Sequence, residues 1–379
     1  MPELNPRARP ASPDAALRAR IVALSLRTLP RMLVPGRPVF GLELAKDHRP
    51  PEFHPVRSWR YTIMCLLGLE RAHRSGQSSG LDLKALLDAT VEASSQFAPG
   101  DLGLLLWLAV RMQASQAEVV AASLEQRLSQ ADLDSLEGME VAWIIAGAAA
   151  HAHSIGARES KVGRRVVDYF LERRISPSGL AWHFGRGWRK RFPNFATQIY
   201  SLHALSLRVR LLGDERCSRQ ATVIAARLKS LQRENGGWPW LYDATRGIVV
   251  EPFEVYSVHQ HAMGPMALIE LHEATGYDVR EMLERSLGWL ESRNELQFPM
   301  IDDRAGLIYR SIRRTKPRDR LAICSRTLKS LAGLSTGRER VQGISGLEIN
   351  STCRPYELGW LLEAWAGRED LIGRVSKSP

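Results

Sequence analysis

The sequence predicts an all-α protein in which about six helical hairpins close into an α/α toroid, with an inner and an outer ring of helices. Three observations support this prediction. Apolar residues recur with helical periodicity through nearly the whole chain. Helices that are apolar on nearly all faces alternate with amphipathic helices, and a helix that is apolar all round must be surrounded by protein. The pairs recur at uneven intervals with long loops, which favours a closed toroid over an even, open solenoid.

The contrast between the two kinds of helix is clear in single segments. YTIMCLLGL at 61–69 and IYSLHALSL at 199–207 are apolar all round, whereas SRQATVIAARLKSLQRE at 218–234 has a polar face. We expect a basic arm, an amphipathic helix near 14–33 and a Pro-rich loop within residues 1–55, the toroid over 56–370 and a tail over 371–379. The expected helix pairs are 57–75 with 82–96, 100–114 with 116–130, 136–153 with 158–174, 194–212 with 215–233, 256–275 with 279–293, and 318–333 with 355–367.

Composition describes an ordinary globular protein with a basic surface. The 379 residues include 52 Lys and Arg against 41 Asp and Glu, which gives a net charge of +11. Much of the excess is Arg spread along helices, and no nucleic-acid motif or compact basic stripe is present, so we expect no nucleic-acid partner. A carbohydrate, another small molecule or an anionic polymer fits better. The basic helix near the N-terminus could also associate weakly with a membrane surface.

The cysteines and the apolar segments bear on location. Cys65, Cys217, Cys324 and Cys353 are too far apart in sequence for a zinc motif and are typical of reduced thiols. The N-terminus lacks the continuous apolar stretch that a signal peptide would contain. No segment has about eighteen apolar residues without a charge, which a transmembrane helix would require. We therefore expect a cytoplasmic protein without a transmembrane helix.

The stretch from Gln232 to Ala274 carries the strongest functional signal. It places two Trp, two Tyr, acidic residues and histidines where a loop meets an apolar helix. Aromatic faces beside titratable groups suit a sugar or another polyol, or a carbocation, although a well-packed helix start is the alternative. Trp238 is expected in the core. Trp240 and Tyr242 are expected to form a stacking wall.

Polar and aromatic residues precede four of the buried helices, at 57–61, 192–198, 251–261 and 354–357. If the inner helices run parallel, these segments converge on one mouth, where helix N-termini favour anions and polar ligands. Ordinary helix capping is the alternative explanation. The residues expected to bind substrate are Trp240, Tyr242, Arg60, Tyr61, His183, Asn194, Gln198, Arg313, Arg314, Arg354 and Glu357.

Glu254 is the best candidate for an acid–base residue, with Tyr256 and His259 as its partners. Glu251 and Asp303 are further candidates, because paired carboxylates are typical of glycosidic bond chemistry. Each of these acids could instead serve a helix start or a turn. His259 and His261 are two residues apart, which is poor spacing for metal ligands on a helix, so we expect no metal site. No motif indicates a cofactor.

Two basic clusters lie in loops near these candidates. One contains Arg186, Arg189, Lys190 and Arg191, and the other runs from Arg310 to Arg320. Arginine binds carboxylates and phosphates through two parallel hydrogen bonds. The clusters therefore fit an anionic ligand such as a uronate polymer or a diphosphate, or they are solvated charge runs.

The layout resembles that of the six-hairpin α/α-toroid carbohydrate-active enzymes. From Gln198 to Gly276 it is similar to the C-terminal domain of glucuronyl C5-epimerases. The similar features are the helix IYSLHALSL, the turn Leu212-Gly213-Asp214, the segment LKSLQ, the loop Gly236-Gly237, the acidic and aromatic segment from Glu251 to Tyr256 and the helix MALIEL. The resemblance implies proton transfer at a uronate, which only Tyr256 and Glu254 would carry. We therefore expect an enzyme that acts on a carbohydrate or glycan intermediate by hydrolysis, elimination or epimerisation, in that order of preference.

A second resemblance is to terpenoid cyclases and prenyltransferase-like toroids. The segment from Gln232 to Trp238 fits their Q-x-x-x-G-x-W motif, which ties outer helices together by stacking, but it occurs once here. The cyclase acid motif D-x-D-D is absent, because Ser135 follows Asp132-Leu133-Asp134. A non-catalytic helical-repeat protein that binds glycans is a third interpretation.

Overall fold

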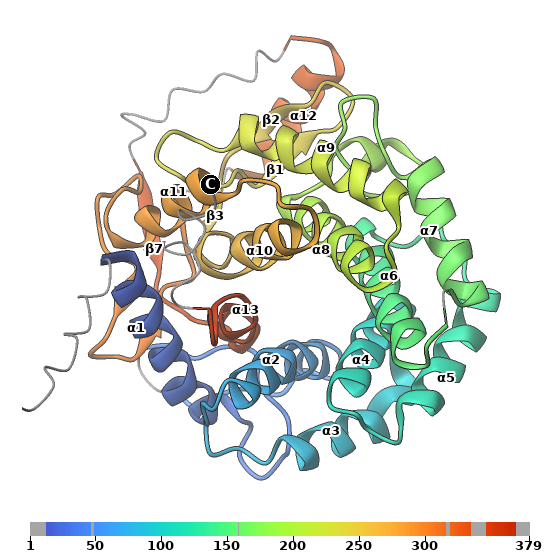
Figure 1. The fold of residues 1–379 in the computed structure, drawn as a ribbon. Helices are drawn as coiled ribbons and strands as arrows, with labels where there is room; N and C mark the ends of the chain where they lie inside the picture. Colours follow the sequence, from blue (N-terminus) through green and yellow to red (C-terminus); the bar gives the residue numbers. More distant parts are fainter. Residues whose placement is uncertain (1–12, 47–48, 158, 316–318, 335–345, 369–379) are drawn as a thin grey trace, which may run out of the picture.

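The computed structural model describes residues 13–46, 49–157, 159–315, 319–334 and 346–368. Its centre is a ring of helices seen end-on in Figure 1. The inner helices are α2 (Arg57–Arg74), α4 (Pro99–Arg111), α6 (Gly138–Ser154), α8 (Phe195–Leu212), α10 (Gly264–Thr275) and α13 (Pro355–Trp365). Each contacts the next, and α13 contacts α2, so the ring is closed. The predicted all-α toroid is therefore confirmed.

Five amphipathic helices form most of the outer ring. They are α3 (Leu83–Glu92), α5 (Ala117–Gln130), α7 (Lys161–Arg173), α9 (Glu215–Leu231) and α11 (Arg280–Glu291). Each packs on the inner helix that precedes it in the chain. In α7, for example, Val166, Val167 and Phe170 are buried, and the charged residues point outward. These five hairpins correspond to the first five predicted pairs.

The sixth hairpin differs from the prediction. Residues 318–333 were expected to pair with the last inner helix, but α12 (Asp319–Leu331) contacts strand β2 (Ile248–Glu251) instead. The outer partner of α13 is α1 (Pro13–Thr28), from the other end of the sequence (Figure 1). The predicted N-terminal helix is thus part of the toroid.

The apolar face of α1 packs against the inner helices. Leu17, Ile21 and Leu24 are buried in the same core as the inner helices, and the Arg18 guanidinium lies 5.4 Å from the centre of the Trp365 ring. The face that would have entered a membrane surface is therefore covered by protein. The expected membrane association through this helix is not supported.

Glycines allow the inner helices to approach closely at two contacts. A Cβ atom at Gly68 of α2 would collide with the carbonyl of Gly359 of α13, and one at Gly147 of α6 would collide with the carbonyl of Gly103 of α4. Any larger residue would push the backbones apart. These pairs explain how the apolar helices pack into a narrow ring.

Short strands, which the sequence did not predict, occupy the long connections that lead into α10 and α13. The strand β1 (Leu241–Asp243) pairs with β2, and β4 (Ile301–Asp302) pairs with β5 (Leu307–Ile308). A three-stranded antiparallel sheet has the order β3 (Val255–Tyr256), β6 (Ser311–Arg314) and β7 (Leu347–Asn350). This sheet joins the segment that leads into α10 to the connection before α13.

The Q-x-x-x-G-x-W segment ties two outer helices together. The Gln232 amide donates to the Met282 carbonyl at 3.1 Å, and the Trp238 indole N–H donates to Ser286 Oγ at 2.8 Å. Trp238 is fully buried, as expected. The motif therefore holds the end of α9 against α11 through hydrogen bonds.

No helix in the described ranges is long and apolar enough to cross a membrane. The four cysteines are free thiols, of which Cys65, Cys217 and Cys353 are buried and Cys324 is exposed. The cytoplasmic location stays a prediction. Residues 1–12 of the expected N-terminal region and the expected tail over 371–379 lie outside the described residues.

Candidate functional site

The starts of α2 and α13 lie side by side at one end of the ring. An Arg354 Nη1–H donates to the Tyr61 hydroxyl at 2.9 Å, and the Tyr61 and Tyr356 rings are 4.7 Å apart between centres. Beside them, Arg60 pairs with Asp101 at the start of α4, with its Nε 2.5 Å from Oδ1, and its guanidinium lies 5.2 Å from the Trp143 ring of α6. The starts of four inner helices are therefore neighbours.

The segment that leads into α10 adds an aromatic cluster. The Trp240 and His259 rings are nearly parallel, with 2° between their planes and 6.2 Å between their centres. Tyr256 lies 5.2 Å from each of them, and Phe195 of α8 lies 4.4 Å from His259. His259 begins a π-helical turn, His259–Met263, directly before α10. Such turns occur frequently at functional sites.

Glu254 and Tyr256 lie together in this segment. Ser311 Oγ donates to Glu254 Oε2 at 3.0 Å. Strand pairing places Tyr256 opposite Ser311, which brings the two strands into register. Burial, followed by the negative charge of Glu254, raises the pKa of the Tyr256 phenol to about 12, although Arg310 acts in the opposite direction. The phenol is therefore protonated at neutral pH and can serve as a proton donor.

Arg310 connects the segment before α10 to the start of α13. Its Nη1–H donates to Glu357 Oε1 at 2.7 Å, and its guanidinium lies 5.0 Å from the centre of the Tyr256 ring. Burial lowers the pKa of Arg310, but the Glu357 carboxylate raises it above its ordinary value. Both side chains are buried, so this charged pair is shielded from water and holds the two helix starts in a fixed relation.

His259 is buried, and its imidazole is neutral. Burial, then the positive charge of Arg310, then His261, lowers the pKa of His259 to about 3. Its Nδ1 has no hydrogen-bond partner among the described residues. His259 thus lies beside Tyr256, as the sequence suggested. Its ring is uncharged and offers an aromatic face and the Nδ1 atom.

The two further carboxylate candidates are held elsewhere by arginines. Glu251 is buried, accepts a hydrogen bond from the Phe253 N–H at 3.0 Å, and pairs with Arg314 and Arg326. Asp303 is about half exposed and pairs with Arg20 of α1. Neither forms a described contact with Glu254, so the structure does not bring a second carboxylate to it from these positions.

Several predicted binding residues make hydrogen bonds that organise the loops. Gln198 is fully buried and forms two hydrogen bonds of 2.8 Å with the Ala181 backbone. Asn194 caps α8 by accepting from the Thr197 N–H at 2.9 Å, and His183 Nδ1 lies 3.0 Å from Thr197 Oγ1. Burial, followed by Arg189, lowers the pKa of His183 to about 4. These contacts occupy the Gln198 amide, the side-chain oxygen of Asn194 and one ring nitrogen of His183.

The remaining predicted binding residues are two aromatic residues, Trp240 and Tyr242, and two arginines, Arg313 and Arg314. Trp240 is partly exposed, whereas Tyr242 is completely buried, so the two do not share one exposed wall. Arg313 is exposed and pairs with Glu348 at 2.8 Å. Arg314 lies 5.0 Å from the Phe253 ring.

Both basic clusters contain arginines that pair with neighbouring carboxylates, as Arg310, Arg313 and Arg314 of the second cluster do with Glu357, Glu348 and Glu251. Arg186 pairs with Asp132 at 2.6 Å, and Arg191 Nε donates to Asp243 Oδ1 at 2.9 Å. Residues 316–318 of the second cluster lie outside the described residues.

Sequence patterns did not indicate three aromatic residues that lie one turn or more inside the inner helices. Trp143 of α6 contacts Tyr200 of α8, with ring centres 5.2 Å apart, and Tyr200 lies 5.9 Å from Trp360 of α13. The indole N–H of Trp143 is buried without a hydrogen-bond partner among the described residues. These residues looked like core on helices that are apolar all round, and Arg310 was assigned only to a basic run.

Six pairs of helices that close into an α/α toroid define the fold class of this chain. No protein-family model matches the sequence, and no curated protein is similar to it in sequence. Solved structures match it over nearly their whole length. The fold expected from the first resemblance is therefore confirmed.

Three solved structures illustrate this likeness. A sugar epimerase from a ruminal bacterium has a TM-score of 0.59 and 11% identity, covering 95% of this chain and 98% of its own. Cellobiose 2-epimerase from Bacillus thermoamylovorans B4167 has a TM-score of 0.58 and 12% identity, covering 95% and 99%. The unsaturated glucuronyl hydrolase from Bacillus sp. GL1 has a TM-score of 0.59 and 11% identity, covering 93% and 96%. At these identities the likeness concerns the fold.

Proposed function

We propose that the protein is a carbohydrate-active enzyme that acts on a glycan or polysaccharide intermediate, with Glu254 and Tyr256 as its proton-transfer groups. The observation that carries the proposal is that the Glu254 carboxylate lies beside the protonated, partly buried phenol of Tyr256 at the N-terminal end of the inner ring. A carboxylate can accept a proton from a sugar carbon or hydroxyl, and a phenol can donate one. The toroids with the same fold that act on sugars support this assignment.

The surrounding side chains suit a sugar. Trp240 and Tyr256 offer apolar ring faces, against which the C–H face of a pyranose packs. The buried N–H of Trp143 and Nδ1 of His259, which have no hydrogen-bond partners among the described residues, could pair with hydroxyl groups. The guanidinium of Arg310 adds positive charge next to Tyr256, which would stabilise a uronate carboxylate or a developing oxyanion.

The charge pattern favours epimerisation or elimination over hydrolysis. Hydrolysis by paired carboxylates requires two acids on either side of the scissile bond. Glu251, Asp303 and Glu357 are each paired with an arginine, whereas no ion pair among the described residues involves Glu254. Glu254, a carboxylate without an ion pair among the described residues, lies beside Tyr256. This arrangement suits abstraction of a proton from a sugar carbon. Return of that proton would complete an epimerisation, and its loss would complete an elimination. The order of reactions expected from the sequence, with hydrolysis first, changes accordingly in this proposal.

Incubation with sugars in D₂O tests the proposal directly. The substrates are cellobiose and unsaturated glucuronyl oligosaccharides, with saturated glucuronate-containing oligosaccharides alongside, and NMR follows deuterium at each sugar carbon. We measure the rate at which deuterium enters a carbon whose configuration changes, as epimerisation requires, or at which a new carbon–carbon double bond forms with loss of a ring proton, as elimination requires. Glu254→Gln should lower this rate by about two to four orders of magnitude, the usual effect of losing general acid–base catalysis. Glu125→Gln, on the exposed face of α5, is the matched control and should keep the wild-type rate.

The same measurement separates the alternatives. Cleavage of a glycosidic bond in a saturated oligosaccharide, with neither carbon-bound deuterium nor a new carbon–carbon double bond in the products, would reassign the reaction to hydrolysis. Saturable sugar binding without any turnover would indicate the non-catalytic glycan-binding protein. Neither binding nor turnover of any sugar would remove the carbohydrate proposal and return attention to the terpenoid-cyclase-like alternative.

A further inference from the structure

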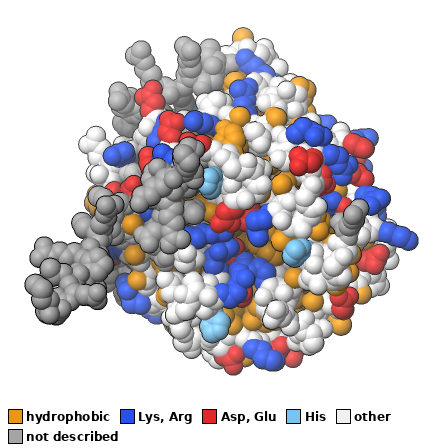
Figure 2. Space-filling model, viewed as in Figure 1, with side chains coloured by type: hydrophobic (Ala, Val, Ile, Leu, Met, Phe, Trp, Pro, Cys, Tyr) orange, Lys and Arg blue, Asp and Glu red, His pale blue; other side chains and the backbone are white. Residues whose placement is uncertain are grey.

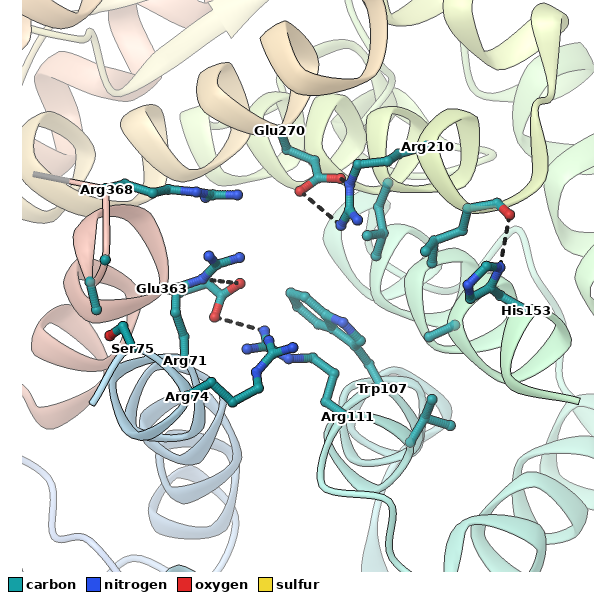
Figure 3. Close-up of a pocket in the computed structure, with 16 residues that line it drawn as sticks. Arg71, Arg74, Ser75, Trp107, Arg111, His153, Arg210, Glu270, Glu363 and Arg368 are labelled. Carbon is teal, nitrogen blue, oxygen red and sulfur yellow. Dashed lines mark hydrogen bonds and ion pairs between the residues drawn. The ribbon is translucent and has the colours of Figure 1, made fainter. Parts of the chain in front are cut away.

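A cavity lies at the opposite end of the ring, where the inner helices end. Its volume is about 490 Å³, within the rough range of 300–1,000 Å³ that is typical of small-molecule sites. Figure 2 shows this face with basic and acidic side chains gathered in a central hollow, and Figure 3 shows the cavity in detail. The charged and aromatic residues that line it are Arg71, Arg74, Trp107, Arg111, His153, Arg210, Glu270, Glu363 and Arg368.

Positive charge predominates around the cavity. Five arginines line it, together with only two carboxylates, Glu270 and Glu363. Two more acids pair with these arginines from beside the cavity. Arg74 Nε lies 2.6 Å from Glu70, and Arg368 Nη2 lies 2.5 Å from Glu273. Five guanidinium groups therefore face four carboxylates.

The carboxylates hold the arginines in fixed positions. Arg111 is largely buried and is clamped between Glu70 and Glu363, with Nη1 2.7 Å from Glu363 Oε2. Arg71 Nε lies 3.3 Å from the other oxygen of Glu363. Figure 3 shows Arg71, Arg74, Arg111 and Arg368 grouped on one side of the cavity, with the Arg210–Glu270 pair facing them. Positively charged groups held in place in this way need little ordering when an anion binds.

Helix capping explains only part of this charge. The C-terminal end of a helix carries partial negative charge, and one arginine in its last turn is an ordinary complement. Here α2 contributes both Arg71 and Arg74, and Arg368 follows the end of α13. Burial, then the charge of Arg71, lowers the pKa of Arg368, and burial, then the charge of Arg111, lowers that of Arg74. The arginines therefore repel one another across the cavity, and a bound anion would relieve this repulsion.

We propose that this cavity is a second ligand site, which binds the anionic group of a small hydroxylated molecule of the sugar phosphate or uronate type. The guanidinium groups of Arg71, Arg74 and Arg111 match the oxygens of a phosphoryl or carboxylate group. Glu270 and Glu363 provide acceptors for hydroxyl groups. Trp107 supplies an aromatic wall. The Arg111 guanidinium lies 5.7 Å from the centre of its ring. The proposal is independent of the reaction at the other end of the ring.

Isothermal titration calorimetry of the full chain at low salt tests the site with four probes. These are inorganic phosphate, glucose 6-phosphate, glucuronate and neutral glucose. We expect at least one of the anions to bind, with an affinity that falls as salt is added, and glucose to show no binding at this site. Preferential binding of the phosphates identifies a phosphorylated ligand, and preferential binding of glucuronate identifies a carboxylated one.

Variants locate the binding. The Arg74 side chain is 59% exposed, so Arg74→Gln should fold normally, and it should weaken anion binding about fivefold or more, as loss of a charged hydrogen bond does. Arg71→Gln, at the opposite edge of Glu363, should act in the same direction. Arg127→Gln on the outer helix α5 removes the same charge from an exposed position and should leave binding unchanged. Melting temperatures confirm that each variant is folded.

Three results would overturn the proposal. The first is that none of the anions binds the wild-type chain. The second is equal affinity in the wild type, Arg74→Gln and Arg71→Gln. The third is loss of anion binding in Trp240→Ala with full affinity in Arg74→Gln, which would place the ligand at the N-terminal ends of the inner helices.

Discussion

The guanidinium of Arg310 lies 5.0 Å from the centre of the Tyr256 ring, and its Nη1–H donates to Glu357 at 2.7 Å. Through these two contacts, Arg310 links the segment before α10 to the start of α13. The pairing of β3 with β6 fixes it further, because Tyr256 is opposite Ser311. The candidate acid group is thus positioned by a connection far away in sequence.

Tyr256→Phe should lower turnover strongly while leaving the fold intact. The change removes only the hydroxyl that we assign as proton donor, and the aromatic contacts with Trp240 and His259 remain. We expect a loss of about two to four orders of magnitude in kcat, with a small change in KM. Because the pKa of Tyr256 is raised to about 12, the donor stays protonated from acid to mildly alkaline pH. A wild-type pH profile in which activity disappears near neutrality through ionisation of this phenol would contradict the assignment.

Trp240→Ala should weaken sugar binding with little loss of stability. Trp240 is partly exposed and stacks on His259, so its removal takes away a ring face that we assign to the ligand. The expected loss is roughly three- to tenfold in affinity, the usual contribution of one aromatic contact.

Trp238→Ala is the matched control. That ring is fully buried and bonded to Ser286, so its removal should cost about 3–5 kcal/mol of stability. Calorimetric titration with the sugar and urea unfolding of both variants give the comparison. A large stability loss and unchanged affinity in Trp240→Ala would assign Trp240 to the core.

The toroid could be predicted because its determinants are local. The repeated change from apolar to amphipathic helices reports burial directly, as in 199–207 and 218–234. The sixth hairpin could not be predicted in the same way. The pairing of α1 with α13 depends on contacts between the two ends of the chain, such as Arg18 over Trp365, and no local pattern encodes them.

Only those residues of the candidate site that lie close together in the sequence could be predicted. Glu254, Tyr256 and His259 belong to one short segment ahead of a helix, so their proximity follows from spacing. Arg310 reaches them through a short strand, which a helix-dominated pattern does not indicate. Conversely, Gln198 has the composition of a binding residue, but its amide is bonded to the Ala181 backbone. Sequence alone cannot distinguish a polar group that organises a loop from one that is free for a ligand.

Gly103→Ala should destabilise the ring. The added methyl group would press against the backbone of Trp143 and Ile144 on α6, where no flexible side chain can move away. Overpacking of this kind typically costs about 1–3 kcal/mol. Gly288→Ala on the outer helix α11 is the control, because its nearest neighbour is the flexible Arg293 side chain, and alanine favours a helix over glycine. Urea unfolding should show a loss for the first variant and none for the second; equal effects would mean that the glycine contact between α4 and α6 is not required.

Asp214→Asn should destabilise the protein in a way that depends on pH. Asp214 caps α9 and accepts from Arg208 Nε at 2.9 Å, and its side chain is only about 10% exposed. Burial alone would raise its pKa, but the hydrogen bonds from Arg208 and Arg216 prevail and lower it to about 2. An aspartate has a pKa of about 3.9 in an unfolded chain, so the ionised native state is favoured by about 2 kcal/mol at neutral pH.

The sign follows from this depressed pKa. The stabilisation is fully present above about pH 4 and is lost as the pH falls towards 2, where the carboxylate is protonated in both states. Asparagine retains the cap but removes the charge. Urea unfolding at a series of pH values should therefore show wild type and variant separated by about 2 kcal/mol at pH 7 and converging in acid. Asp82→Asn, at the exposed cap of α3, should show a smaller separation, because Asp82 has no ion pair among the described residues. A separation for Asp214→Asn that is the same at pH 7 and pH 3 would show that shape, and not the charge paired with the two arginines, stabilises this turn.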